Sequence, residues 1–255
     1  MLYQIKKYIQ FLLKSSNQHG VHSPFVYQLV THCFYNRQPY TDYNSLKTYR
    51  AALIKNQTAL QVTDLGMGSK KNKTTQRQVS ELAKTAGSTL KRAKLAYRIS
   101  HYFKPQQILE LGSSLGIATQ AFHLGHPAAK ITTVEGCPNI AAFTKNNLSN
   151  YTNISCKTGA FKTFLNAENK TTWDIVFFDG HHNKDATLAY FQALLPQTHN
   201  DTLFIFDDIY WSPNMTDAWE TIKKHPKVTV TIDIFFWGLV FFRQEQVKQH
   251  FTIRV

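Results

Sequence analysis

The sequence predicts an α/β protein with a mostly parallel sheet of seven strands, and three observations carry this prediction. From Gln106 onward, short apolar runs typical of buried strands alternate with stretches of helical periodicity. Strands that alternate with helices form a parallel sheet covered on both faces, as in Rossmann-like folds. The last two apolar runs are joined by so short a connection that they must form an antiparallel hairpin. We therefore expect a helical N-terminal region over residues 1–90 and a Rossmann-like domain over residues 91–255.

The elements follow in order from the apolar pattern. Up to about Lys104 the pattern is mostly helical, and Pro105 ends the helix that contains Leu95 and Ile99. Seven strands are expected at 107–111, 131–134, 153–156, 173–178, 202–206, 228–234 and 239–242. Helices are expected between them at 117–124, 139–148, 185–195 and 217–224. The turn of the final hairpin is expected at Trp237–Gly238.

The composition is typical of a globular protein that stays in a reducing compartment. Of 255 residues, 43% are hydrophobic and 18% charged. The three cysteines form no CxxC pair, which excludes a zinc site built from cysteines. The apolar residues of Met1–Lys14 are interrupted by lysines, unlike a signal peptide, and no run approaches the ~20 apolar residues of a membrane span. We expect a cytoplasmic protein with no membrane partner.

The formal net charge of +13 favours anionic partners. Most basic residues are scattered, apart from two groups, Lys70–Arg77 and Lys91–Lys94. Net charge indicates that a protein can associate with anions, but not which reaction it catalyses. A nucleic-acid substrate therefore remains an alternative to a small molecule.

A glycine turn follows the first predicted strand of the domain. Glu110 lies near the end of that strand, and Gly112, Ser113 and Gly116 lead into the next helix, where backbone N–H groups can bind an anion. Glu135 and Gly136 end the following strand, about 20 residues on, where an acid can bind a ribose diol. The full G-x-G-x-x-G of dinucleotide enzymes is missing. This pair of motifs predicts a nucleoside-type cofactor.

At these residues the sequence resembles the class I S-adenosylmethionine-dependent methyltransferases, in particular the small-molecule O-methyltransferases of the catechol and caffeoyl-CoA type. The resemblance implies S-adenosylmethionine as the cofactor, with a nicotinamide cofactor as the alternative. It also implies that Gly159 and Ala160, after the third strand, lie at the adenine. A second candidate turn, Asp64–Ser69, has no strand ending in an acid after it, so we prefer the Glu110 turn.

Three carboxylates end the next two strands. Asp179 follows the strand at 173–178, and Asp207 and Asp208 follow the strand at 202–206. Hard oxygen ligands suit Mg²⁺, and the resemblance implies such a metal at these positions. The third ligand of that family is usually Asn, so Asp208 departs from the pattern. The alternative is that no metal binds there.

His182 is the candidate general base, because histidine ordinarily titrates at about pH 6.5. Its neighbour His181 is the rival, and the resemblance places Asp179 beside the sulfonium. We expect methyl transfer to a hydroxyl or other heteroatom of a small-molecule acceptor, with catalytic Asp179 and His182. The alternatives are an RNA methyltransferase and a non-catalytic module that binds S-adenosylmethionine. The oligomeric state stays open, a homodimer included.

Overall fold

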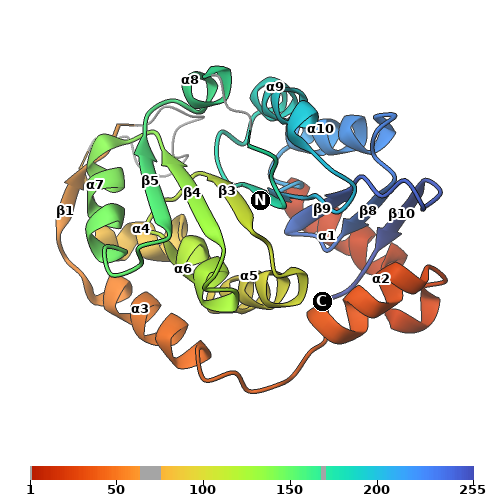
Figure 1. The fold of residues 1–255 in the computed structure, drawn as a ribbon, viewed down its shortest axis with the longest axis horizontal. Helices are drawn as coiled ribbons and strands as arrows, with labels where there is room; N and C mark the ends of the chain where they lie inside the picture. Colours follow the sequence, from red (N-terminus) through yellow and green to blue (C-terminus); the bar gives the residue numbers. More distant parts are fainter. Residues whose placement is uncertain (1, 64–75, 168–170) are drawn as a thin grey trace.

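The computed structural model describes residues 2–63, 76–167 and 171–255 and places one large sheet at the centre of the molecule (Figure 1). Its eight strands run in the order β10-β8-β9-β7-β6-β3-β4-β5. The strands are β3 (Gln107–Leu111), β4 (Lys130–Glu135), β5 (Ile154–Thr158), β6 (Ile175–Phe178), β7 (Leu203–Asp207), β8 (Val230–Asp233), β9 (Trp237–Phe241) and β10 (Gln249–Thr252). β3 to β7 are parallel, whereas β9 is antiparallel to both β7 and β8. The mostly parallel sheet with its antiparallel hairpin is therefore confirmed.

Alternating residues of the central strands bury two separate cores, one on each face of the sheet. Along β6, Ile175 and Phe177 belong to one core, and Val176 and Phe178 belong to the other. One face is covered by α5 (Leu90–Phe103) and α6 (Ile117–Gly125), with α7 (Pro138–Asn147) beside β5. The opposite face is covered by α8 (Phe161–Asn166), α9 (Lys184–Leu194) and α10 (Pro213–Lys224). Side chains of a strand point alternately to the two faces, which explains the division.

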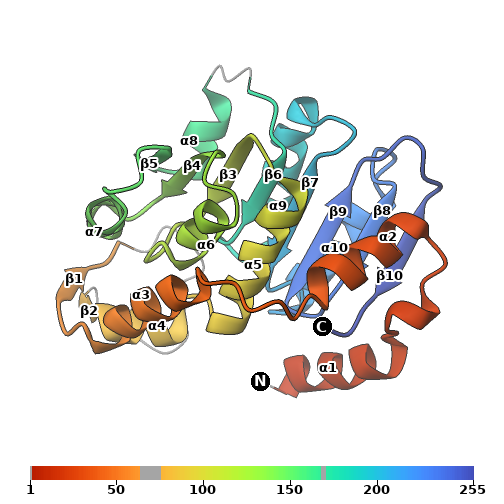
Figure 2. The ribbon, with the colours of Figure 1, turned by 60° about the horizontal axis from the view of Figure 1, so that its bottom comes forward.

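Most helices of the N-terminal region pack into the first of these cores (Figure 2), whereas the first helix packs on Phe235 through Tyr8 and Phe11. Its helical elements are α1 (Leu2–Lys14), η1 (Gln18–Gly20), α2 (Pro24–Leu29), η2 (Val30–Phe34), α3 (Tyr43–Lys55) and α4 (Val79–Thr85). A small antiparallel pair, β1 (Ala59–Gln61) and β2 (Gln76–Gln78), lies between α3 and α4. Leu29 and Leu46 are buried in the same cluster as Ile108 of β3. The division at residue 90 stays a prediction, and the core of the described residues is continuous across it.

The structure differs from the sequence prediction at the C-terminal end of the sheet. β10 was not expected, and it adds an eighth strand parallel to β8. The predicted turn at Trp237–Gly238 is wrong, because both residues belong to β9. The chain turns instead at Ile234–Phe236, where Phe235 has a φ of 73° and Ile234 accepts a hydrogen bond from Phe236. The aromatic residues of this turn concealed it from a search for glycine and proline.

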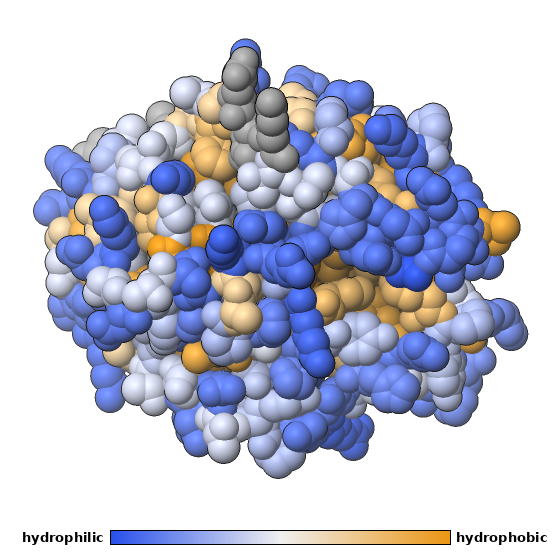
Figure 3. All heavy atoms as spheres, in the orientation of Figure 1, coloured by the Kyte–Doolittle hydropathy of each residue, from blue (hydrophilic) through white to orange (hydrophobic). Residues whose placement is uncertain are grey.

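Among the described residues, no helix is both long and apolar enough to cross a membrane. Hydrophilic side chains cover most of the face seen in Figure 3, with smaller apolar patches between them. The pattern agrees with the burial of the large apolar side chains in the two cores.

Candidate active site

The carboxyl ends of β3 and β6 approach each other at Gly112. The Gly112 backbone has a φ of 109°, and a Cβ atom there would lie 2.0 Å from the carbonyl oxygen of Asp179. Asp179 N–H donates to the carbonyl of Leu111 over 2.9 Å, so the two strand ends are joined at this point. Only glycine combines this backbone conformation with so close an approach. Gly112 thus holds the predicted cofactor turn against the strand that carries Asp179.

Glu135 binds the same turn from the end of β4. Its carboxylate accepts hydrogen bonds from the Ser114 N–H at 3.0 Å and the Cys137 N–H at 2.9 Å. Burial raises the pKa of Glu135, and these N–H donors act in the opposite direction. The structure therefore brings the acid of the second motif into contact with the turn of the first, next to Gly136.

Glu110 supports the turn from inside the protein. It is fully buried and accepts hydrogen bonds from Thr119 and Thr133, each at 2.5 Å. Thr133 also contacts the Ser113 hydroxyl at 2.5 Å. Burial raises the pKa of Glu110 to about 7, although the two threonine donors oppose the shift. The Glu110 Oε1 atom has no hydrogen-bond partner among the described residues.

The raised pKa of Glu110 predicts a pH-dependent stability. An unfolded glutamate titrates near 4.5, whereas the pKa of Glu110 in the folded protein is about 7. Between these values the folded protein keeps a proton that the unfolded chain releases, so the free energy of unfolding falls as the pH rises. Glu110→Gln should remove this loss, which is on the order of 3 kcal/mol. Urea unfolding at pH 5 and pH 8 measures it, and parallel pH profiles for the two proteins would contradict the prediction.

His181 packs against the beginning of α8. Its φ is 54°, and its ring packs edge-on against Phe161 at 5.2 Å between centroids. Phe161 begins α8 directly after Gly159 and Ala160, and the Gly159 N–H donates to the Glu135 carbonyl at 2.9 Å. His181, Gly159 and Ala160 therefore lie on the Glu135 side of the site.

Asp179, His182 and Asp207 converge at the ends of β6 and β7. Each offers one possible ligand atom, and these atoms all lie within 4.8 Å of one another. The Asp179 and Asp207 carboxyl groups share a hydrogen bond, and two carboxyl groups do so only when one of them holds a proton. Burial, together with the charge of Asp207, raises the pKa of Asp179 well above its usual range. Burial also raises the pKa of Asp207, to about 6, with Asp208 adding to the shift.

Arg92, from the first turn of α5, joins this group. Its guanidinium donates to both carboxylate oxygens of Asp207, at 3.1 and 3.4 Å, and to Asp208 at 3.2 Å. Asp208 lies outside the converging trio, so the predicted metal ligands Asp179, Asp207 and Asp208 are not brought together as one set. The arginine holds two of these three carboxylates. The residues therefore do not fit the predicted three-carboxylate Mg²⁺ site.

The N-terminal region contributes residues that the sequence did not single out. A small cavity beside the cofactor turn is lined by Gly87 and Ser88 as well as by Ser113, Ser114 and Asp179. The Tyr49 hydroxyl of α3 donates to the carbonyl of Leu115 at 2.7 Å. No sequence motif marks these residues, because their role follows from packing between distant segments.

Arg92 was visible in the sequence only as a member of the basic group Lys91–Lys94. The alternative turn Asp64–Ser69 lies outside the described residues.

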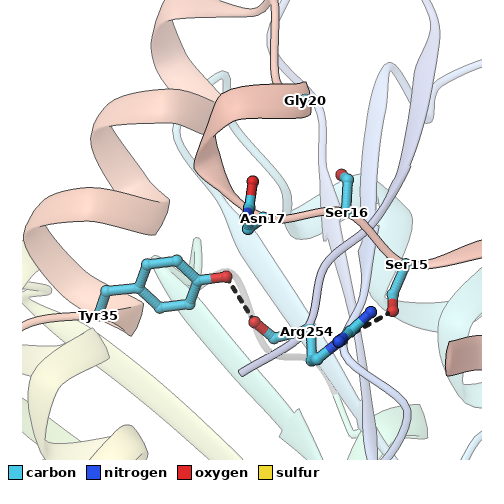
Figure 4. A pocket seen from close by; sticks show the side chains of 6 residues that line it. All are labelled: Ser15, Ser16, Asn17, Gly20, Tyr35 and Arg254. Atoms are coloured by element: carbon cyan, nitrogen blue, oxygen red, sulfur yellow. Dashed lines mark hydrogen bonds between the residues drawn. The ribbon is translucent and has the colours of Figure 1, made fainter.

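A larger cavity of about 390 Å³ lies away from the strand ends, where α1 meets the C-terminal segment (Figure 4). The side chains of Ser15 and Arg254 and the Tyr35 hydroxyl surround it. Tyr35 donates to the Arg254 carbonyl at 2.6 Å, and Arg254 donates to Ser15 at 3.3 Å. It contains none of the predicted site residues, so the strand ends remain the candidate active site.

Part of the chain matches a known protein family. Residues 109–209 match the family described as "Methyltransferase domain", which confirms a methyltransferase domain in the part of the chain where the sequence predicted one. No curated protein matches the sequence.

Three solved structures share the fold. The SAH-bound methyltransferase PaMTH1 of Podospora anserina is 14% identical, with a TM-score of 0.61, over 88% of this chain and 97% of that one. The Bacillus cereus O-methyltransferase, in complex with SAH, is 16% identical, with a TM-score of 0.56, over 80% and 92%. The O-methyltransferase TomG of Streptomyces achromogenes, in complex with SAM, is 16% identical, with a TM-score of 0.54, over 62% and 82%. These likenesses confirm the Rossmann-like methyltransferase fold.

Proposed function

We propose that this chain, which carries a methyltransferase domain at residues 109–209, transfers the methyl group of S-adenosylmethionine to a hydroxyl group of a small molecule. One observation carries the proposal. The glycine turn with Glu135 and the group Asp179, His182 and Asp207 lie at the carboxyl ends of adjacent strands, where ligands of such sheets bind. The structural relatives with bound SAM or SAH support the choice of cofactor.

The chain's own residues fit this cofactor. Glu135 stands where it can accept hydrogen bonds from a ribose, in exchange for its present N–H donors Ser114 and Cys137. The N-terminus of α6 offers N–H groups for the carboxylate of the methionine portion. Phe161 and His181 flank the position proposed for the adenine, beside Gly159 and Ala160. When bound, S-adenosylmethionine supplies a methyl group activated by a sulfonium.

The proposed chemistry is a direct displacement in which the protein positions the acceptor and removes its proton. His182 accepts the proton of the acceptor hydroxyl, and the oxygen then forms its bond to the methyl carbon as the carbon–sulfur bond breaks. The electron pair of that bond stays on sulfur, and His182 releases the proton to solvent. Asp179, at the end of β6, lies between the cofactor turn and His182. Most of the rate enhancement then comes from proximity and orientation.

Methyl-labelled S-adenosylmethionine and a panel of phenols, catechols and thiols test this proposal. We expect label to pass to a hydroxyl-bearing acceptor, and His182→Gln to lower kcat/KM by about 100-fold near pH 7. His181→Gln tests the rival base: because the His181 ring packs on Phe161, beside the position proposed for the adenine, its loss should raise KM for the cofactor more than it lowers kcat. Transfer only to RNA would favour the alternative substrate class. The cytoplasmic location and a homodimeric state stay predictions.

A further inference from the structure

Arg92 occupies the place that a divalent cation would take among the carboxylates. Its two terminal nitrogens contact Asp207 at 3.1 Å and Asp208 at 3.2 Å. The side chains involved are shielded from water, with exposed fractions of 27% for Arg92, 7% for Asp207 and 25% for Asp208. Ion pairs of this kind are little screened by salt. The contact is therefore a fixed part of the site.

The surroundings of Arg92 hold the guanidinium in position. Its backbone N–H donates to the Thr89 hydroxyl, which caps α5, and its guanidinium lies 5.0 Å from the ring centre of Phe236. The Phe236 carbonyl accepts a hydrogen bond from the Asp208 N–H at 2.8 Å. Asp208 itself has a φ of 52°, an uncommon conformation for a residue with a side chain. The turn between β8 and β9, which contains Phe236, thus contacts both Arg92 and Asp208.

Binding of a divalent cation would have to displace this arginine. Both oxygens of Asp207 accept hydrogen bonds from Arg92, so the central ligand of the converging trio is already engaged. A cation bound to Asp179, His182 and Asp207 would also lie next to a permanent positive charge. A guanidinium and a metal ion therefore exclude each other here.

We propose that Arg92 replaces the divalent cation in this active site, so that methyl transfer needs no metal and the acidic group binds one only when Arg92 is removed. The proposal deepens the proposed function, because it assigns the cation of the same site. Arg92 is a positioning residue in this account. It holds Asp207 and Asp208 in place and supplies the positive charge beside the acceptor.

Titration of Mn²⁺ into the metal-stripped protein, without cofactor or acceptor, tests the proposal. We expect no binding to the wild type below 1 mM, an order-of-magnitude bound typical of sites without a dedicated cage. Arg92→Gln should bind Mn²⁺ at least about tenfold more tightly, because Asp207 is then free beside Asp179 and His182. Adding Asp207→Asn to Arg92→Gln should abolish the gain. Lys91→Gln is the matched control, since it removes the same charge from the same helical turn, and Lys91 donates to the Val255 carbonyl, away from the acidic group.

Two outcomes would overturn the proposal. One is micromolar Mn²⁺ binding by the wild type, a result that does not depend on whether any variant folds. The other is a folded Arg92→Gln, verified by circular dichroism, that binds Mn²⁺ no better than Lys91→Gln. Arg92→Lys, which keeps the charge, should behave like the wild type. With an acceptor in hand, EDTA should leave wild-type turnover unchanged within twofold. Because the Mn²⁺ titration uses neither cofactor nor acceptor, its failure is separate from failure of the proposed methyl transfer.

Discussion

Gly112→Ala should lower the free energy of unfolding by about 3 kcal/mol or more and abolish binding of S-adenosylhomocysteine. The new Cβ would lie 2.0 Å from the Asp179 carbonyl oxygen and 2.7 Å from its carbon, both of them backbone atoms that cannot rotate away. The ends of β3 and β6 would have to separate, and the cofactor turn would move with them. Urea unfolding and a binding titration measure the two effects.

Gly159→Ala is the matched control. Gly159 also has a positive φ, of 144°, but a Cβ atom there would meet nothing within 4 Å. This substitution should therefore lower the free energy of unfolding only by the backbone strain, about 1–2 kcal/mol. Equal losses of stability for the two variants would show that conformation alone, and not the contact with Asp179, makes Gly112 necessary.

Asp179→Ala should lower kcat/KM for methyl transfer by at least about 100-fold while the protein stays folded. Asp179 connects the cofactor turn to the catalytic group, through its backbone at Leu111 and its carboxyl group at Asp207. Its side chain is a half-buried acid next to other acids, so its removal relieves repulsion and should not destabilise the fold.

Asp179→Asn sharpens this prediction. The asparagine amide can donate to Asp207 and keep the hydrogen bond between the two side chains, so this variant should retain more activity than the alanine variant. Steady-state kinetics of both variants against the same acceptor provide the comparison. Unchanged turnover in Asp179→Ala would remove Asp179 from the catalytic group.

The sequence was sufficient for the central sheet because β3, β6 and β7 are buried and mostly apolar runs between helical stretches. The acids and glycines at the strand ends stand out for the same reason, since Glu135 and Asp179 interrupt apolar stretches at the points where ligands bind. β10 was missed because Gln249–Thr252 is a short, half-polar edge strand. Such a strand has little apolar pattern to detect.

The role of Arg92 could not be read from the sequence. It precedes Asp207 by 115 residues, and its neighbours Lys91 and Lys94 made it part of an ordinary basic group. Glu110 shows the opposite limit. The motif was found, but only the structure shows that its carboxyl group is buried against Thr119 and Thr133. The position of Glu110 in the motif predicts where it lies in the fold, and its contacts determine its role there.

Calorimetric titration of S-adenosylhomocysteine into the purified protein, with EDTA present, measures whether the glycine turn and Glu135 bind the cofactor. We expect binding in the micromolar range, about −8 kcal/mol, and at least about tenfold weaker binding by Glu135→Ala. Asp217→Ala, which removes an exposed acid paired with Lys184 on the surface, should bind like the wild type. Absence of binding by the folded wild-type protein, with or without Mg²⁺, would contradict the assignment of this site to S-adenosylmethionine.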